Sequence, residues 1–307
     1  MRYFKLLCLF LPCALSAEAL ILRTEDGGIT WQREESRCFN SLNAVAADMI
    51  TDLMIAVGER GTILLRDASG VWQDVSPAGL TADLNSVAIA VNGLCMVCGD
   101  DGTLLSSFDR GESWRLWDEF DCGGVDLLSV NFAPTSPDLF VITGDDGFTR
   151  FSEDWSIQFI DSEPIVGSCF RLCSGAPEFI ASASGRMVSD DAVAGETGFP
   201  VRGVTPVVSG GSHPFLVGED GMMSTVNGSA REVVPGLSAD LKSVSALTWG
   251  SDCCAVGEGG TILVSHDNGS DWELLTGIAL RDLNGVCSNG SGTGCIVGDT
   301  VLDRILP

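Results

Sequence analysis

The strongest constraint on the fold is a pattern of about 40 residues that recurs through most of the chain. Each copy begins with Leu-x-x-Val and continues into an apolar run that ends in a glycine and an acidic residue. The first motif occurs at 42–45, 84–87, 127–130, 241–244 and 283–286. The closing glycines are Gly58, Gly99, Gly144, Gly218, Gly257 and Gly298. The interval between Gly144 and Gly218 has room for one degenerate copy near Ala183–Gly185, so the chain contains seven units.

Each unit is built from short β-strands. Apolar runs such as Asp52–Val57 and Thr62–Arg66 are separated by acidic-glycine turns that suit hairpins. No long stretch has a helical period, which excludes a parallel α/β fold. Seven units of this length predict an all-β fold, a seven-bladed β-propeller of four-stranded antiparallel blades.

The two ends of the chain are expected to complete one blade together. Leu20–Thr24 looks like the third strand of a unit and Ile29–Gln32 like the fourth, while Leu283–Val297 supplies the first two strands of the last unit. N-terminal strands that complete the last blade would hide exposed sheet edges. The pattern leaves open whether Val301–Leu306 pairs or competes with Leu20–Thr24.

The N-terminus has the features of an export signal. Arg2 and Lys5 precede an apolar stretch, Leu6–Leu15, and Ala17-Glu18-Ala19 offers small residues for cleavage after Ala19 or, as a second choice, after Ala17. We therefore expect a signal peptide at 1–19 and a propeller at 20–307. No later run is long enough to span a bilayer. The predicted location is the periplasm, a compartment like the thylakoid lumen, or the exterior.

The charge of the chain restricts its partners. The formal net charge is −25, with 17 Lys and Arg against 42 Asp and Glu. Such a surface repels phosphate backbones and anionic lipids, which argues against nucleic acid and membrane-surface partners. A client protein with a basic segment, including a membrane protein, is the natural complement.

A second motif lies between the expected third and fourth strands. It has the form Ser/Thr-x-Asp-x-Gly-x-x-Trp and is similar to the Asp-box, or BNR repeat. The carboxylate and hydroxyl of such a loop cap backbone amides, and the tryptophan packs beneath them. We therefore predict a structural role for Asp26, Trp31, Asp109, Trp114, Asp267 and Trp272.

The combination of Leu-x-x-Val, Val-Gly-x-x-Gly-Thr-Ile-Leu and the Asp-box resembles the photosystem II stability and assembly factor family of propellers. The resemblance covers the chain after residue 19 except 166–236, which matches poorly. It implies a non-catalytic lumenal or periplasmic assembly factor that holds a client membrane protein. Photosynthetic members of that family have an arginine-rich patch for the client, whereas the arginines here are scattered singly.

The residue types argue against an enzyme. Asp-boxes also occur in sialidases, but these use a tyrosine nucleophile, and the single tyrosine, Tyr3, lies in the signal segment. His213 and His266 are expected to be structural, so we predict no catalytic residue, no metal and no cofactor. Cysteine pairing is left open, with Cys287–Cys295 and Cys169–Cys173 as candidates. The alternative function is a secreted carbohydrate-binding or glycoside-hydrolase-like propeller, with Trp117, Trp155 and Trp249 as platforms for a sugar.

The repeated acidic residues provide the candidate binding site. Turns between second and third strands share one face of a propeller with the links between blades. The predicted turn residues are Glu59, Asp100, Asp145, Glu219, Glu258 and Asp299. The predicted link residues are Asp83, Asp126, Asp240 and Asp282. One interpretation is that each acid only suits a tight turn and caps local amides. The other is that these carboxylates form an electronegative face for a basic client segment or a divalent cation, and of these two we expect electrostatic docking of a protein.

Overall fold

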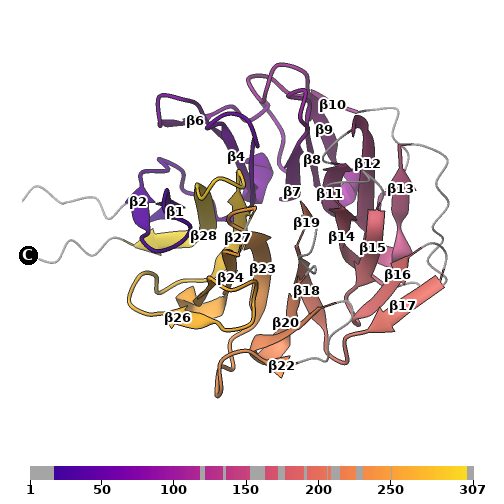
Figure 1. The fold of residues 1–307 in the computed structure, drawn as a ribbon. Helices are drawn as coiled ribbons and strands as arrows, with labels where there is room; N and C mark the ends of the chain where they lie inside the picture. The colour runs from indigo at the N-terminus through magenta and orange to yellow at the C-terminus, as the bar shows by residue number, and fades with distance from the viewer. Residues whose placement is uncertain are drawn as a thin grey trace, which may run out of the picture.

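A computed structural model shows seven antiparallel sheets arranged in a ring about a common axis (Figure 1). The structure describes residues 17–117, 122–133, 136–152, 163–171, 177–189, 192–205, 207–208, 215–225, 231–249 and 251–302. The predicted all-β, seven-bladed propeller of four-stranded blades is confirmed. The repeats therefore correspond to blades, numbered here from the one that begins at Leu42.

In each blade the first strand lies nearest the axis and the fourth lies at the outside of the ring. Blade 1 contains β3 (Leu42–Ala47), β4 (Met54–Gly58), β5 (Ile63–Arg66) and β6 (Trp72–Asp74). Blade 2 contains β7 (Leu84–Ile89), β8 (Cys95–Gly99), β9 (Leu104–Ser107) and β10 (Arg115–Leu116). The described part of blade 3 contains β11 (Leu127–Ala133), β12 (Ser136–Gly144) and β13 (Thr149–Phe151). Blade 4 contains β14 (Ile165–Arg171), β15 (Pro177–Ser182), β16 (Arg186–Ser189) and β17 (Ala192–Glu196).

The remaining blades follow the same order. Blade 5 contains β18 (Val201–Val204), β20 (Phe215–Gly218), β21 (Met222–Thr225) and β22 (Arg231–Glu232). Blade 6 contains β23 (Leu241–Ala246), β24 (Cys253–Gly257), β25 (Ile262–Ser265) and β26 (Glu273–Leu275). Blade 7 contains β27 (Leu283–Ser288), β28 (Gly294–Leu302), β1 (Ala17–Thr24) and β2 (Gln32–Glu34). One further strand, β19 (Val207–Val208), pairs with the inner edge of β14.

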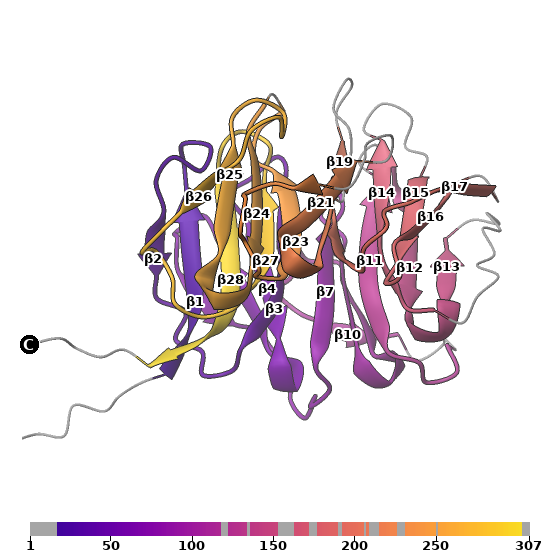
Figure 2. The same ribbon diagram turned by 90° about the horizontal axis from the view of Figure 1, so that it is seen from below.

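The innermost strands contact one another around the whole ring. Contacts run from β3 to β7, β11, β14, β18, β23 and β27 and return to β3. All these strands run in the same direction along the axis, so each face of the ring collects one type of connection (Figure 2). One face carries the turns from second to third strands and the links between blades. The opposite face carries the loops from first to second strands and from third to fourth strands.

The apolar runs are buried because each blade packs between two others. In β4, every residue from Met54 to Gly58 is buried. Ile55 and Val57 of blade 1 pack in one cluster with Val87 and Val97 of blade 2. Burial of one such side chain contributes about 1.5–3 kcal/mol, so no blade is expected to be stable alone.

In blades 1, 2, 3, 5 and 6 the connection from the second to the third strand is a single 3₁₀ turn, and glycine recurs in it for two separate physical reasons. In blade 1 this turn is η1 (Glu59–Gly61). A Cβ on Gly58 would lie 2.0 Å from the Ser41 carbonyl oxygen of the incoming link, so glycine is needed there for close approach. Gly61 has a φ of +72°, which favours glycine for conformational reasons. The other turns are η2 (Asp100–Gly102), η3 (Asp145–Gly147), η4 (Glu219–Gly221) and η5 (Glu258–Gly260).

The poor sequence match around 166–236 begins at a polar interface between blades 3 and 4. Thr143 is fully buried at the position that Val57 occupies in blade 1, and its hydroxyl has no hydrogen-bond partner within the described residues. Ser168 and Ser182 of blade 4 are also buried. Thr143 and Ser168 thus replace aliphatic residues of the repeat, whereas Ser182 stands at the position of the repeated Gly58.

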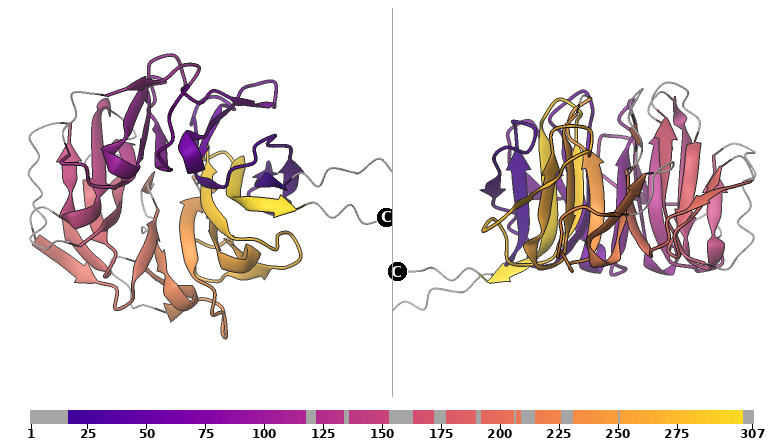
Figure 3. Two further views of the ribbon diagram at one scale, coloured as in Figure 1. Left: turned by 180° about the vertical axis from the view of Figure 1, so that it is seen from behind. Right: turned by 60° about the horizontal axis from the view of Figure 1, so that its bottom comes forward.

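Blade 7 closes the ring, as predicted, with two strands from each end of the chain (Figure 3). β1 pairs with β28 from Thr24↔Gly294 to Ala17↔Leu302. Val301 and Leu302 therefore extend β28 beside Ala17 and Glu18, and they do not compete with Leu20–Thr24. The predicted signal peptide overlaps β1 at residues 17–19, and its residues 1–16 lie outside the described part of the chain.

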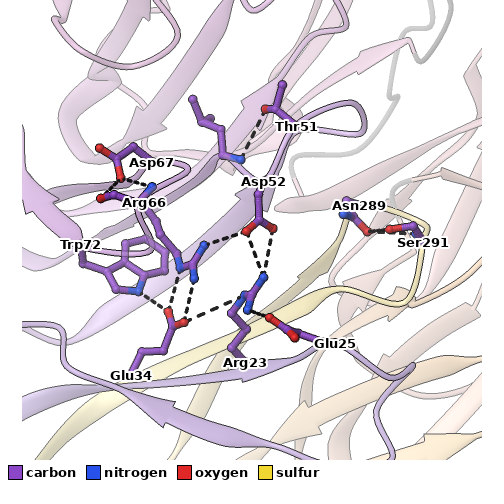
Figure 4. A network of polar contacts seen from close by, with 12 residues as sticks. Arg23, Glu25, Glu34, Thr51, Asp52, Arg66, Asp67, Trp72, Asn289 and Ser291 are labelled. Atoms are coloured by element: carbon purple, nitrogen blue, oxygen red, sulfur yellow. Dashed lines mark hydrogen bonds and ion pairs between the residues drawn. The ribbon is translucent and has the colours of Figure 1, made fainter.

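A network of charged side chains joins blade 7 to blade 1 (Figure 4). The Arg66 guanidinium donates to both Glu34 oxygens at 3.0 Å and contacts Asp52 at 3.1 Å. Trp72 Nε1 donates to Glu34 Oε2 at 2.8 Å, and Arg23 contacts Asp52 at 3.0 Å. We call Arg23, Glu34, Asp52, Arg66 and Trp72 the closure network. It links the blade completed by both termini to its neighbour by charge-assisted hydrogen bonds.

Candidate functional site

The predicted acidic residues lie on one face of the ring, because the 3₁₀ turns and the links between blades meet there. We call this the acidic face. All ten predicted residues lie at this end of the blades, nine in turns or links and Asp299, predicted in a turn, within β28. They are Glu59, Asp83, Asp100, Asp126, Asp145, Glu219, Asp240, Glu258, Asp282 and Asp299.

The four link aspartates bridge neighbouring blades. Each accepts a hydrogen bond from the backbone N–H of the middle turn residue in the preceding blade. The distances from the backbone nitrogen to Oδ1 are 2.7 Å for Arg60 to Asp83, 2.8 Å for Asp101 to Asp126, 3.1 Å for Asp220 to Asp240 and 3.0 Å for Gly259 to Asp282. Hydrogen bonds to a charged group contribute about 1.5–3 kcal/mol, with less at exposed positions. One oxygen of each carboxylate is thus committed to the fold.

The turn carboxylates have several kinds of partner. Asn85 Nδ2 donates to Asp100 Oδ1 at 2.8 Å, and Asn284 Nδ2 donates to Asp299 Oδ1 at 3.0 Å. The same amides donate to main-chain oxygens of the next blade, at Leu127 for Asn85 and at Leu42 for Asn284. These asparagines join the innermost strands at the acidic end of the axis.

The negative charge is unevenly distributed over the acidic face. On blades 5 to 7, Arg202 contacts Glu219 at 2.6 Å and Lys242 contacts Asp282 at 2.8 Å. The Lys242 hydrogen bond is the main cause of the lowered pKa of Asp282. On blades 2 and 3, by contrast, burial and the carboxylates of Asp126, Asp146 and Asp100 raise the pKa of Asp145. Four carboxylates, those of Asp100, Asp126, Asp145 and Asp146, therefore lie close enough over blades 2 and 3 for the other three to act on Asp145.

The residues of the predicted Asp-box motif lie on the opposite face, between third and fourth strands. Asp26, Asp109 and Asp267 each accept a backbone N–H, at 2.9 Å, from the residue four positions later. Hydrogen bonds from the Ser113 hydroxyl and amide, in that order, lower the pKa of Asp109 to about 2. Trp31 and Trp272 donate through Nε1 to the carbonyls of Gly28 and Gly269, each at 3.1 Å. The Trp114 Nε1 is buried without a hydrogen-bond partner in the described chain.

Several residues that carry chemistry in other proteins are held in ordinary structural contacts here. His266 Nδ1 lies 2.8 Å from Asp252 Oδ1, and His213 falls outside the described residues. Cys287 and Cys295 face each other in register across β27 and β28 as free thiols. Burial raises the pKa of Cys95 and Cys287 to about 12, which suppresses the nucleophilic thiolate. Cys173 and Trp155 lie outside the described residues, as does the side chain of Cys169.

The described residues contain no group of three or more His, Cys, Asp or Glu side chains placed to hold a metal ion. Within the same ranges, no helix has the length and apolar character needed to cross a bilayer.

The comparisons with known proteins rest on the three-dimensional structure. No protein-family model matches the sequence, and no curated protein has significant similarity to it. The chain shares its fold with YCF48. The structure of YCF48 bound to D1 peptide superimposes with a TM-score of 0.63 at 13% identity, covering 85% of this chain and 91% of that one.

Two further structures give the same result. YCF48 from Cyanidioschyzon merolae has a TM-score of 0.64 at 15% identity and covers 85% of this chain and 94% of its own. The WD40 propeller domain of Doa1 has a TM-score of 0.63 at 16% identity, covering 84% and 93%. At these identities the likeness establishes the propeller fold.

Proposed function

We propose that this chain is a non-catalytic, extracytoplasmic binding scaffold or assembly factor, similar to photosystem II assembly factors, that docks a client protein on its acidic face. The observation that carries the proposal is the set of carboxylates that the turns and links bring to this face, which includes the group over blades 2 and 3. A basic segment of a client is electrostatically complementary to that group. The propeller fold, which this chain shares with a YCF48 bound to a peptide, supports a role in protein binding.

The geometry defines how the face can be tested without unfolding the ring. Asp83, Asp126 and Asp240 each use one oxygen to accept a backbone N–H. An asparagine in the same place retains an oxygen that can accept this bond, while it removes the charge. Asp282 is left unchanged because Lys242 already compensates it.

The experiment compares the triple variant D83N/D126N/D240N with wild type. The probe is a fluorescein-labelled dodecapeptide rich in lysine and arginine, with a glutamate-rich peptide as the reference. Exposed ion pairs contribute about 0.2–1 kcal/mol each, so loss of three charges should weaken binding by roughly 3- to 150-fold at low salt. The difference should shrink as NaCl is raised.

A matched control removes three charges from the opposite face. E112Q/D271N/E273Q changes exposed residues of the third-to-fourth-strand loops and the start of β26. This control should bind the basic peptide as wild type does, within twofold. Equal binding by D83N/D126N/D240N and wild type would contradict docking on the acidic face. Affinity capture from the native envelope with the same set of variants then identifies the client.

A further inference from the structure

The face opposite the acidic one contains an apolar cavity at the axis of the ring. Its volume is about 160 Å³, and it is lined by the ends of the innermost strands and the loops that follow them in blades 1, 2, 3, 6 and 7. The wall includes many small apolar side chains, among them Ala46, Ala88, Ala133 and Ala246. None of the lining residues is charged. We call this cavity the axial mouth.

Two exposed apolar side chains stand at its rim. Met49, in the loop after β3, is 36% exposed, and Trp249, in the loop after β23, is 45% exposed. Both also line the axial mouth. The carboxylate next to Met49, that of Asp48, is buried and contacts Arg110 at 2.9 Å. Its charge is therefore compensated locally.

The chain itself shows what kind of segment lies beside this part of the axis. β19 pairs in parallel with the inner edge of β14, through Phe170↔Val207 and Arg171↔Val208 (Figure 2). These residues are at the end of β14 that points to the same face as the axial mouth. An extended backbone is thus accommodated inside the ring at this level, by addition to an innermost strand.

We propose that the axial mouth is a second docking site, which binds an extended, uncharged segment of a partner protein and receives one large apolar side chain from it. A cavity of about 150 Å³ can hold a benzene ring, so a volume of about 160 Å³ suits one phenylalanine or leucine side chain. The uncharged wall excludes a charged residue at that position because its desolvation would be uncompensated. The high negative charge of the chain favours a protein over an anionic lipid surface as the source of this side chain. This site is separate from the acidic face and does not depend on it.

The test begins with a random dodecapeptide library displayed on phage and selected on wild-type protein in 150 mM NaCl. We expect the selected peptides to share one aromatic or leucine residue within an uncharged stretch. The best peptide is then synthesised, labelled and titrated by fluorescence polarisation. Met49→Asp and Trp249→Ser should each weaken it by about 10- to 100-fold, the value of burying one such side chain.

The matched control lies one residue from Met49. Ile50 is 71% exposed on the same loop but does not line the axial mouth, so Ile50→Asp should bind within twofold of wild type. D83N/D126N/D240N should also bind as wild type does, which separates this site from the proposed client face. Thermal midpoints of all variants identify any that fail to fold, and Trp249→Ser is informative if Met49→Asp does fail.

Four results would overturn the proposal. The first is selection of basic peptides that share no apolar residue. The second is a peptide that binds Met49→Asp and Trp249→Ser as tightly as wild type, and the third is a loss of affinity in Ile50→Asp as large as in those two variants. The fourth is binding of phosphatidylcholine vesicles with no peptide selected.

Discussion

Ring closure rests on the closure network, and truncation of Glu34 is its most informative perturbation. The Arg66 side chain is 6% exposed and donates two hydrogen bonds to Glu34, while Asp52 supplies a third contact. Removal of one partner of a buried ion pair costs about 3–5 kcal/mol. Because Asp52 remains, we expect Glu34→Ala to lower the free energy of unfolding by about 3 kcal/mol, the lower end of that range. At about 2 °C per kcal/mol for a chain of this size, the midpoint should fall by about 6 °C.

The neighbouring residue provides the control. Glu35 also faces an arginine, Arg37, but the pair is 3.8 Å apart and the two side chains are 83% and 71% exposed. Glu35→Ala should therefore change stability by less than about 1 kcal/mol. Differential scanning calorimetry and urea unfolding measure both variants. If Glu34→Ala and Glu35→Ala are equally stable, burial of the Arg66 network does not hold blades 7 and 1 together.

Two more predictions concern the Asp-box loop and the N-terminus. The Asp109 pKa, about 2 in the folded protein, lies below the ordinary value of about 3.9, so its stabilisation is present above pH 4 and is lost as pH falls towards 2. The thermal midpoint of wild type should drop more steeply over that range than that of Asp109→Asn, and parallel curves would refute a role for this carboxylate. Mass spectrometry of the exported protein should find a mature chain that starts at Leu20, or at Glu18 if cleavage follows Ala17. An N-terminus at Met1 would refute the predicted signal peptide.

The sequence was most informative where one residue type serves the same purpose in every blade. Gly58 and its counterparts are repeated because the link backbone lies against them, and this made the blade count predictable. The match failed in blade 4, where the buried Ser168 and Ser182 stand at the positions of Val45 and Gly58, two of the residues by which the repeat is recognised. The sequence does not decide whether residues 301–302 pair, because their partners, Ala17 and Glu18, also belong to the predicted export signal.

The candidate sites were predictable to different degrees. Turn acids could be placed on one face from their periodic positions. The bond from the Arg60 N–H to Asp83 was not foreseen, since it joins two blades across 23 residues. The compensation of Asp282 by Lys242 also depends on two blades being adjacent. The axial mouth left no signal in the sequence, because small, ordinary residues from five blades line it and none is unusual in its local context.

The pairing of β1 with β28 has a consequence for how the protein is made. The β1 strand is synthesised long before its partner, β28, which includes residues 294–302. Until β28 has been synthesised, the edge of β1 that faces β28 is unpaired and blade 1 lacks a complete blade 7 beside it. A nascent chain therefore keeps the edge of β1 exposed to pairing with other chains while residues 25–293 are made. Deletion of only the last 14 residues, which include β28, would leave every preceding blade encoded but the ring open.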